Sequence, residues 1–374
     1  MNTNNRHRNL RKFNVFLFIS TFARSLIEIF ISLFLFKNGF SIHDILVFYI
    51  LENVFAIFIS YFFVKIGEKY KYSTVMYIGI VSFVLLQFVL NNIDHSMAYI
   101  ILVAFLYSMY RRGYWVSRRF YATSIVPQKN SSSSFSLMIA ISELASILSG
   151  FVGGFLLDGF DTVVMTTISS ILLVISVAPL FGLKQDARNN KIELLKNLKK
   201  YDKRNYLAFT LYEINNLLSF IFPIYIALYV KDTYMLAGSI NAISNVAIIL
   251  FVVLYGKLLK KRNFFIISTL LFIGVSFAKL FFLNYFVLAI YFIEGMIKKM
   301  QEQSVSKIYF ENRKDMDLTH YNLIYQLIES VARALVAVSL LFMNDIRMMI
   351  PFILAVISVE LLAYTFTKKD KHLR

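Results

Sequence analysis

The chain has 374 residues, of which 58% are hydrophobic and 16% are charged, and its mean hydropathy is +0.64. Soluble domains carry about 25% charged residues, so this composition excludes a soluble globular protein and predicts an integral membrane protein. The formal net charge is +17. The absence of cysteine excludes disulfides, thiolate nucleophiles and cysteine-ligated metal sites.

Apolar runs long enough to cross a bilayer recur along the whole chain. A membrane-spanning helix needs about 20 residues. Runs near this length occupy 13–36, 43–65, 73–91, 96–117, 134–157, 162–183, 205–229, 234–256, 264–283, 286–308, 322–343 and 348–367. We therefore predict an all-α integral membrane fold with twelve transmembrane helices. The connections are short, which leaves no room for a soluble catalytic domain and places function inside the bundle.

The placement of the basic residues explains the net charge. Lys and Arg gather near both ends of the chain and in alternate connections, at 6–12, 65–71, 118–129, 184–204, 257–262, 307–314 and 368–374. The intervening connections carry mostly Asp. Under the positive-inside rule, this pattern predicts a multi-pass protein of the cell membrane with both termini in the cytoplasm. A basic cytoplasmic face accounts for most of the charge, so we expect no nucleic-acid partner.

The longest polar segment, 184–204, divides the predicted helices into two sets of six. Sliding the chain by 187 residues aligns "MYRRGYWVS" (109–117) with "MIKKMQEQS" (296–304), so that an Arg pair meets a Lys pair. Matches of this kind indicate a parallel repeat, as in transporters whose site lies between two halves near mid-membrane. The predicted organisation is an N-terminal six-helix half (1–183), a cytoplasmic linker (184–204) and a C-terminal six-helix half (205–374).

Four segments combine glycines and basic residues in a recognisable order. They are "KIGEKYKYSTVM" (65–76), "YGKLLKKRNFF" (255–265), "YWVSRRFYATSIVPQKN" (114–130) and "SGFVGGFLLD" (149–158). With the twelve-helix pattern, they resemble the major facilitator superfamily, although the first lacks the Asp-Arg pair usual in that family's loop after span 2. The resemblance implies two six-helix halves around a central cavity, with spans 3, 6, 9 and 12 as peripheral supports.

Charged residues inside the predicted spans are informative, because a charge at mid-membrane costs about 2.5–3.5 kcal/mol and normally faces a partner or a wet cavity. Spans 3 and 6 contain none, and spans 9 and 12 contain one each, Lys279 and Glu360. Seven of the other eight spans carry charges that include Arg24, Glu28, Glu52, Arg111, Arg112, Glu143, Glu213, Glu294, Lys298, Lys299, Glu329 and Arg333, and 234–256 has Asn241 and Asn245 instead. This distribution fits the division into peripheral and cavity-lining helices that the resemblance implies.

Three pairs of opposite charge stand four residues apart, so each pair can share one helix face. They are Arg24 with Glu28, Glu294 with Lys298, and Glu329 with Arg333. Two interpretations stay open. The pairs are static and lower the cost of insertion, or a carboxylate alternates between pairing with a cation and holding a proton. Under the second interpretation, the proton-coupling candidates are Glu28, Glu52, Glu143 and Glu329, of which the last two are almost equivalent in the repeat.

A second set of residues is predicted to line the substrate cavity. It comprises Arg24, Arg111, Arg112, Asn215, Asn241, Glu294, Lys298 and Arg333. Buried Asn often only bridges helices, so that alternative stays open for both Asn residues. Trp115, the sole tryptophan, is expected to anchor span 4 at the membrane interface, and stacking against substrate is the alternative. The recurring basic pair favours a partly anionic substrate.

Enzymes are the main rival class, and the sequence argues against them. The five histidines lie in the termini or at loop edges, at His7, His43, His95, His320 and His372. Histidines in these positions indicate neither a metal site nor a His-based catalytic triad. No Gly-Lys-Ser/Thr phosphate-binding loop is present. We expect no enzymatic activity, no cofactor and no metal, and a membrane receptor or scaffold without transport activity stays open.

The sequence therefore predicts a secondary transporter that works by rocking two halves around a central cavity. We expect a monomer in the lipid bilayer that couples protons to the export of a small organic, drug-like or peptide compound. Export is favoured because Gly150, Gly153 and Gly154 resemble the fifth-span motif of antiporters in the family. The alternatives are a flippase for a lipid-linked substrate and a proton symporter that imports an anionic nutrient.

Overall fold

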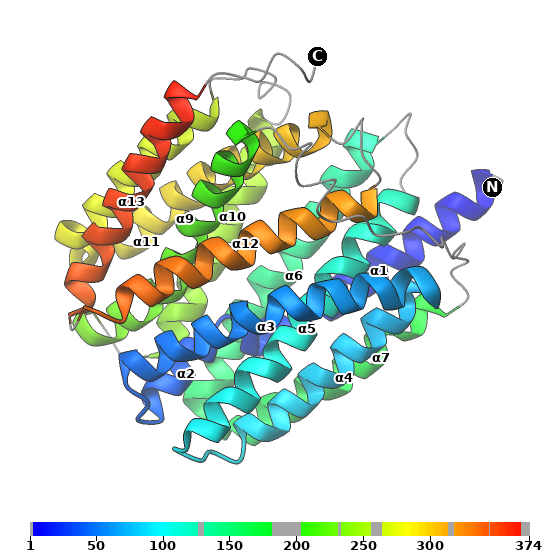
Figure 1. Ribbon diagram of the computed structural model, residues 1–374. Helices are drawn as coiled ribbons and strands as arrows, with labels where there is room; N and C mark the ends of the chain where they lie inside the picture. The colour runs from blue at the N-terminus through cyan, green and yellow to red at the C-terminus, as the bar shows by residue number, and fades with distance from the viewer. Residues whose placement is uncertain are drawn as a thin grey trace.

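The computed structural model describes residues 3–125, 131–181, 203–230, 233–255, 264–312, 318–343 and 345–367. Every regular element in these ranges is a helix, and the long helices run through one bundle (Figure 1). In chain order they are α1 (Thr3–Glu28), α2 (Ile31–Lys37), α3 (Ile42–Lys69), α4 (Tyr72–Leu90), α5 (Met97–Ile125), α6 (Ser131–Gly159), α7 (Thr162–Ser176), the 3-10 turn η2 (Ala178–Leu180), α9 (Lys203–Tyr229), α10 (Tyr234–Tyr255), α11 (Phe264–Asn312), α12 (Leu318–Leu340) and α13 (Ile346–Phe366).

The helices follow from the apolar composition. Water is absent from the hydrocarbon core, so a spanning chain satisfies its backbone groups internally, and a helix does so within one segment. Short polar residues set several helix starts. The Ser41 hydroxyl accepts from the Asp44 N–H at 3.1 Å, and the Asp44 carboxylate accepts from the Ser41 N–H at 2.9 Å. This capping box begins α3, and Asp161 and Asp345 begin α7 and α13.

Among the described residues, ten helical segments are long and apolar enough to cross a membrane. The expected spans at 96–117 and 286–308 are not among the ten, although both are helical. These two carry the Arg-Arg and Lys-Lys pairs. The structure thus supports a multi-pass, all-helical membrane fold, and the count of twelve stays a prediction.

One expected span is broken, and two others are joined in one long helical element. The first is divided into α1 and α2 by a turn at residues 29–30. The predicted spans 9 and 10 are joined in α11, and Phe286, with φ −130° and ψ 30°, separates its two helical parts. In membranes, such breaks are tolerated where the backbone is buried in protein or lines a cavity.

Within the described residues, two helix pairs make the largest contacts between the predicted N-terminal and C-terminal halves, and smaller ones join α2 to α9 and α5 to α12. The helix α6 packs along α10, and α3 packs along α12. Figure 1 shows α3 in blue and α12 in orange running side by side. The other contacts of α4 with α5, of α1 with α6 and of α9 with α13 stay within one predicted half.

Glycines allow the contact between α6 and α10. A Cβ atom on Gly238 would lie 2.0 Å from the carbonyl oxygen of Gly150, and one on Gly154 would lie 2.8 Å from the Cα of Met235. A Cβ atom on Gly153 would lie 2.8 Å from the carbonyl oxygen of Leu26 on α1. Small residues at such crossings let backbones approach closely. The three glycines of the predicted antiporter-like motif therefore pack α6 between α1 and α10.

Candidate functional site

A cavity of about 310 Å³ lies where α1 breaks into α2. Its walls come from α1, α2 and α6 of the predicted N-terminal half and from α9, α10 and α11 of the C-terminal half. Five of the residues predicted from the sequence line it, namely Arg24, Glu28, Asn241, Glu294 and Lys298. The structure therefore gathers charged side chains from both ends of the chain around one space.

The α1 side of the cavity carries the pair Arg24–Glu28, whose side chains are in direct contact. The Tyr107 hydroxyl donates a hydrogen bond to Glu28 Oε1 at 3.3 Å. The Arg24 guanidinium lies 5.1 Å from the ring centroid of Tyr114 and 5.5 Å from that of Trp115. Arg24 is thus held between its carboxylate partner and two rings of α5.

Trp115 contacts a second guanidinium as well. Arg118 lies 4.7 Å from the Trp115 ring centroid and donates a hydrogen bond to the Ser142 hydroxyl on α6 at 3.0 Å. The sequence predicted interfacial anchoring for Trp115. The structure shows a half-buried ring between Arg24 and Arg118 that supports a cavity residue.

The α11 side of the cavity carries two lysines that share one carboxylate. Lys279 Nζ lies 2.6 Å from Glu294 Oε2, and Lys298 Nζ lies 3.2 Å from Glu294 Oε1. The Lys279 ammonium also lies 3.8 Å from the ring centroids of both Phe222 and Tyr291. The resemblance had implied that the span of Lys279 is a peripheral support. The structure instead places Lys279 in the cavity wall, where its side chain is fully buried.

A separate network of buried ion pairs joins α3 and α5 to α12. Arg111 lies 2.9 Å from Glu52 and 3.4 Å from Glu329, and Arg112 lies 3.2 Å from Glu329. Because Glu329 is on α12, these pairs connect the predicted halves. The sequence placed Arg111 and Arg112 in the substrate cavity. The structure places them in this network and not among the residues that line the 310 Å³ cavity.

The network continues along α12 to α9. Arg333 lies 3.0 Å from Glu329 and 2.5 Å from Glu213. The Tyr325 hydroxyl donates to Glu213 at 2.7 Å. Arg333 was also predicted to line the cavity, and its side chain lies in the network instead. The chain of ion pairs contains three arginines and three glutamates, namely Arg111, Arg112, Arg333, Glu52, Glu213 and Glu329.

The predicted pairs at four-residue spacing are all present, within α1, α11 and α12. The repeat also predicted that Glu143 corresponds closely to Glu329. Glu143, on α6, interacts electrostatically with Lys299 on α11. The predicted repeat aligns Lys299 with Arg112, and Lys299 forms an ion pair with Glu302 at 2.8 Å.

The Asn residues differ in position. Asn241 lines the cavity, and its amide nitrogen also lies 3.3 Å from the Ser146 hydroxyl on α6. Asn245, one turn further, donates to the same hydroxyl at 2.9 Å. Helix bridging is therefore present at Asn241 together with exposure to the cavity. Asn215 is buried on α9 and is not among the cavity-lining residues, which corrects its predicted place.

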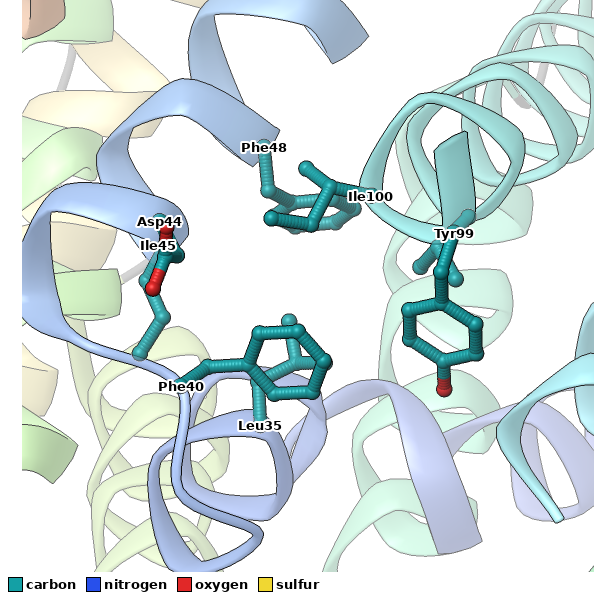
Figure 2. Close-up of a pocket in the computed structure, with 8 residues that line it drawn as sticks. Leu35, Phe40, Asp44, Ile45, Phe48, Tyr99 and Ile100 are labelled. Carbon is teal, nitrogen blue, oxygen red and sulfur yellow. The ribbon is translucent and has the colours of Figure 1, made fainter. Parts of the chain in front are cut away.

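A smaller gap lies between α2, α3 and α5. Figure 2 shows Phe40, Phe48 and Ile100 around it, with the Asp44 carboxylate at one side. The gap has no room for a water molecule, with about 0 Å³ open to one. It is a packing defect among apolar side chains and offers no site.

Several cavity residues were missed from the sequence. Lys279 was visible as a lone charge in an apolar run, but only the rotation of the helix shows that it reaches the cavity. Phe222, Tyr291 and Ser146 have no distinguishing sequence signal. Within the described residues, no group of three or more His, Cys, Asp or Glu is placed to hold a metal ion.

The comparisons with known proteins agree with this architecture. The family described as Major Facilitator Superfamily matches residues 14–300 of the chain. No curated protein matches the chain significantly. The match covers more than half of the sequence. It includes all the residues that line the cavity, from Arg24 on α1 to Lys298 on α11. The chain belongs to the major facilitator superfamily.

Proposed function

We propose that this protein is a proton-coupled secondary transporter that exports a small organic compound by alternating access. Family membership supports secondary transport in general. The proposal includes twelve spans, rocking of 1–183 against 205–374, and a monomer in the cell membrane with both termini cytoplasmic. Its substrate is a drug-like or peptide compound, and protons are its second partner.

The cavity carries this proposal. Its walls come from both predicted halves, so a rocking motion of one half against the other would open it to either side. Its volume of about 310 Å³ is at the low end of the range of about 300–1,000 Å³ found for small-molecule sites. A small substrate that is enclosed between the halves fits this size.

Proton coupling is supported by buried carboxylates that are paired with cations in the cavity wall and in the network between the halves. Glu28 is in the cavity wall with Arg24, and Glu52 is in the network that joins the halves through Arg111. Protonation would neutralise a carboxylate and release its cation, so protonation and the arrangement of the halves are linked. Glu143 and Glu329 are the next candidates, because Glu329 pairs with Arg112 of the other half and Glu143 interacts electrostatically with Lys299.

Export is supported by the glycine motif of α6, which packs closely against α10 and α1. A proton symporter that imports an anionic nutrient is the second candidate. It is favoured by the charges of the cavity lining, where Arg24, Lys279 and Lys298 outnumber Glu28 and Glu294.

The test is transport in proteoliposomes with an imposed pH gradient and a panel of organic compounds. Wild type is compared with Glu28→Gln and Glu52→Gln, and we expect both variants to lose gradient-driven transport. Glu360→Gln is the matched control, because Glu360 on α13 accepts a hydrogen bond from Thr210 at 2.5 Å and lies outside the cavity lining. Full gradient-driven transport by both test variants would refute the coupling assignment.

A further inference from the structure

We infer that the substrate carries a carboxylate or phosphate group, and that this anionic group binds at the lysine pair of α11, Lys279 and Lys298, which share Glu294. The inference rests on the proposed function, in that the cavity is taken as the substrate site. It narrows the expectation drawn from the sequence, which based a partly anionic substrate on the Arg pair of α5 and its counterpart, Lys298 and Lys299.

The first support is the charge of the cavity lining. It contains three cations and two carboxylates, namely Arg24, Lys279, Lys298, Glu28 and Glu294. The sum is one positive charge. Electrostatic interactions are stronger inside a protein than in water, because the effective dielectric constant is lower. An anion that enters the cavity therefore meets a net attraction, and a cation meets a net repulsion.

The second support is where the surplus charge lies. On α1, one arginine faces one carboxylate, and two aromatic rings hold the guanidinium. On α11, two ammonium groups face one carboxylate, at 2.6 and 3.2 Å. The Lys298 side chain is 24% exposed, whereas that of Glu294 is 2% exposed. Of Lys279, Lys298 and Glu294, Lys298 is therefore the residue that an incoming group can reach.

Lys279 acts as a positioning residue in this arrangement. Its ammonium lies between the rings of Phe222 and Tyr291 and makes the shorter of the two contacts with Glu294. A cation over an aromatic face is attracted by the ring quadrupole. Lys279 is thus fixed in place and shares Glu294 with Lys298.

The other buried cations do not offer such a site. Arg111, Arg112 and Arg333 are matched by three glutamates and lie outside the cavity lining. Lys299, which is also buried and outside the lining, pairs with Glu302 at 2.8 Å. An anion there would add a charge to a balanced set. Within the described part of the chain, the group formed by Lys279, Lys298 and Glu294 on α11 is where positive charge exceeds negative charge in the cavity wall.

The test uses three small probes of nearly the same shape, namely benzoate, benzamide and benzamidine, which are anionic, neutral and cationic. Binding of radiolabelled probe is measured by equilibrium dialysis on the full chain in phosphatidylcholine nanodiscs, with empty nanodiscs subtracted. We expect benzoate to bind at least about tenfold more tightly than benzamide, since one unit charge contributes this much in a partly hydrated site. Benzamidine should bind most weakly. Equal or weaker binding of benzoate would overturn the inference.

Variants then separate charge from structure. Lys279→Met lowers the charge of the group formed by Lys279, Lys298 and Glu294 from +1 to 0 and should remove the preference for benzoate. The double variant Lys279→Met with Glu294→Gln returns the charge to +1 and should restore it. Lys65→Met, on the exposed end of α3, is the control and should bind benzoate as wild type does. If the double variant stays as weak as the single one, or if Lys65→Met loses as much, the assignment fails.

A final arm adds phosphatidylglycerol to the nanodiscs. Loss of benzoate binding would identify a lipid headgroup as the source of the anionic group, and unchanged binding would identify a soluble anion. Both results keep the site. Because the assay measures binding without a gradient, a correct charge preference together with absent transport would refute the proposed function and leave the site in place.

Discussion

The carboxylate of Asp158, at the end of α6, accepts a hydrogen bond from the backbone N–H of Met235, in the first turn of α10, at 2.7 Å. The other oxygen of Asp158 accepts from the N–H of Tyr234 at 3.1 Å. The first N–H groups of a helix have no partner in the helix, and a carboxylate there is stabilising. One side chain of the predicted N-terminal half thus caps a helix of the C-terminal half, and this contact has to break if the halves separate at that end.

We predict that Asp158→Ala opens this end of the cavity. Loss of a capping side chain costs about 0.5–2 kcal/mol, which corresponds to a shift of about 2- to 30-fold toward the separated halves. The chain has no cysteine, so Ser32→Cys in the cavity wall supplies a single reporter thiol. The measurement is the rate of its reaction with a membrane-impermeant maleimide, which should rise.

The control for Asp158→Ala is Asp161→Ala. Asp161 also caps a helix, since its carboxylate accepts from the Val163 N–H at 3.4 Å, but that helix is α7 of its own half. This variant should leave the labelling rate of Ser32→Cys near that of the parent. A rise as large as that of Asp158→Ala would show that general destabilisation, and not the contact between the halves, exposes the cavity.

A second prediction concerns the crossing of α6 and α10. Gly238→Ala would bring a Cβ atom to 2.0 Å from the Gly150 carbonyl oxygen, so the helices have to move apart. Overpacking of this kind costs about 1–3 kcal/mol. We expect a lower thermal unfolding midpoint and faster labelling of Ser32→Cys. In contrast, Gly274→Ala on α11 meets no atom within 4 Å and should leave both near wild type. An unfolding midpoint of Gly238→Ala at or above wild type would contradict the close crossing.

A third prediction uses the balance of the ion-pair network. Glu329→Gln leaves three arginines with two glutamates, and breaking a buried pair in this way costs about 3–5 kcal/mol. Arg112 forms its ion pair with Glu329, so Glu329→Gln combined with Arg112→Met restores the balance. We expect the double variant to unfold at a higher temperature than Glu329→Gln alone. Additive losses in this double-mutant cycle would mean that the two side chains do not interact.

The helices were predictable because their cause is local. Long apolar runs must form helices in lipid, and the described elements lie close to the predicted ranges. The intrahelical pairs were predictable for the same reason, since residues four apart share a face whatever the helix packs against. The turn at residues 29–30 was not, because nothing in that segment interrupts the apolar pattern. The break at Phe286 lies at the boundary expected between the spans 264–283 and 286–308.

The candidate site was predicted only in part. Of the residues predicted for the substrate cavity, Arg24, Asn241, Glu294 and Lys298 line the 310 Å³ space, together with the coupling candidate Glu28. Arg111, Arg112 and Arg333 belong to a balanced network between the halves. The residues are the same type in both places. Their roles differ because each helix is rotated by its packing, which the spacing along one helix does not specify.

By itself, the sequence determined that the chain is a helical membrane protein with intramembrane charges and a basic set of connections. The tertiary structure decided which charges meet. Close contact at Gly150 and Gly238 sets how α6 lies on α10, and the rotation of α11 turns Lys279 toward Glu294 and the cavity. The bilayer drives each helix to form alone, but a pair of charges or a cavity wall depends on the packing of helices that are distant along the chain.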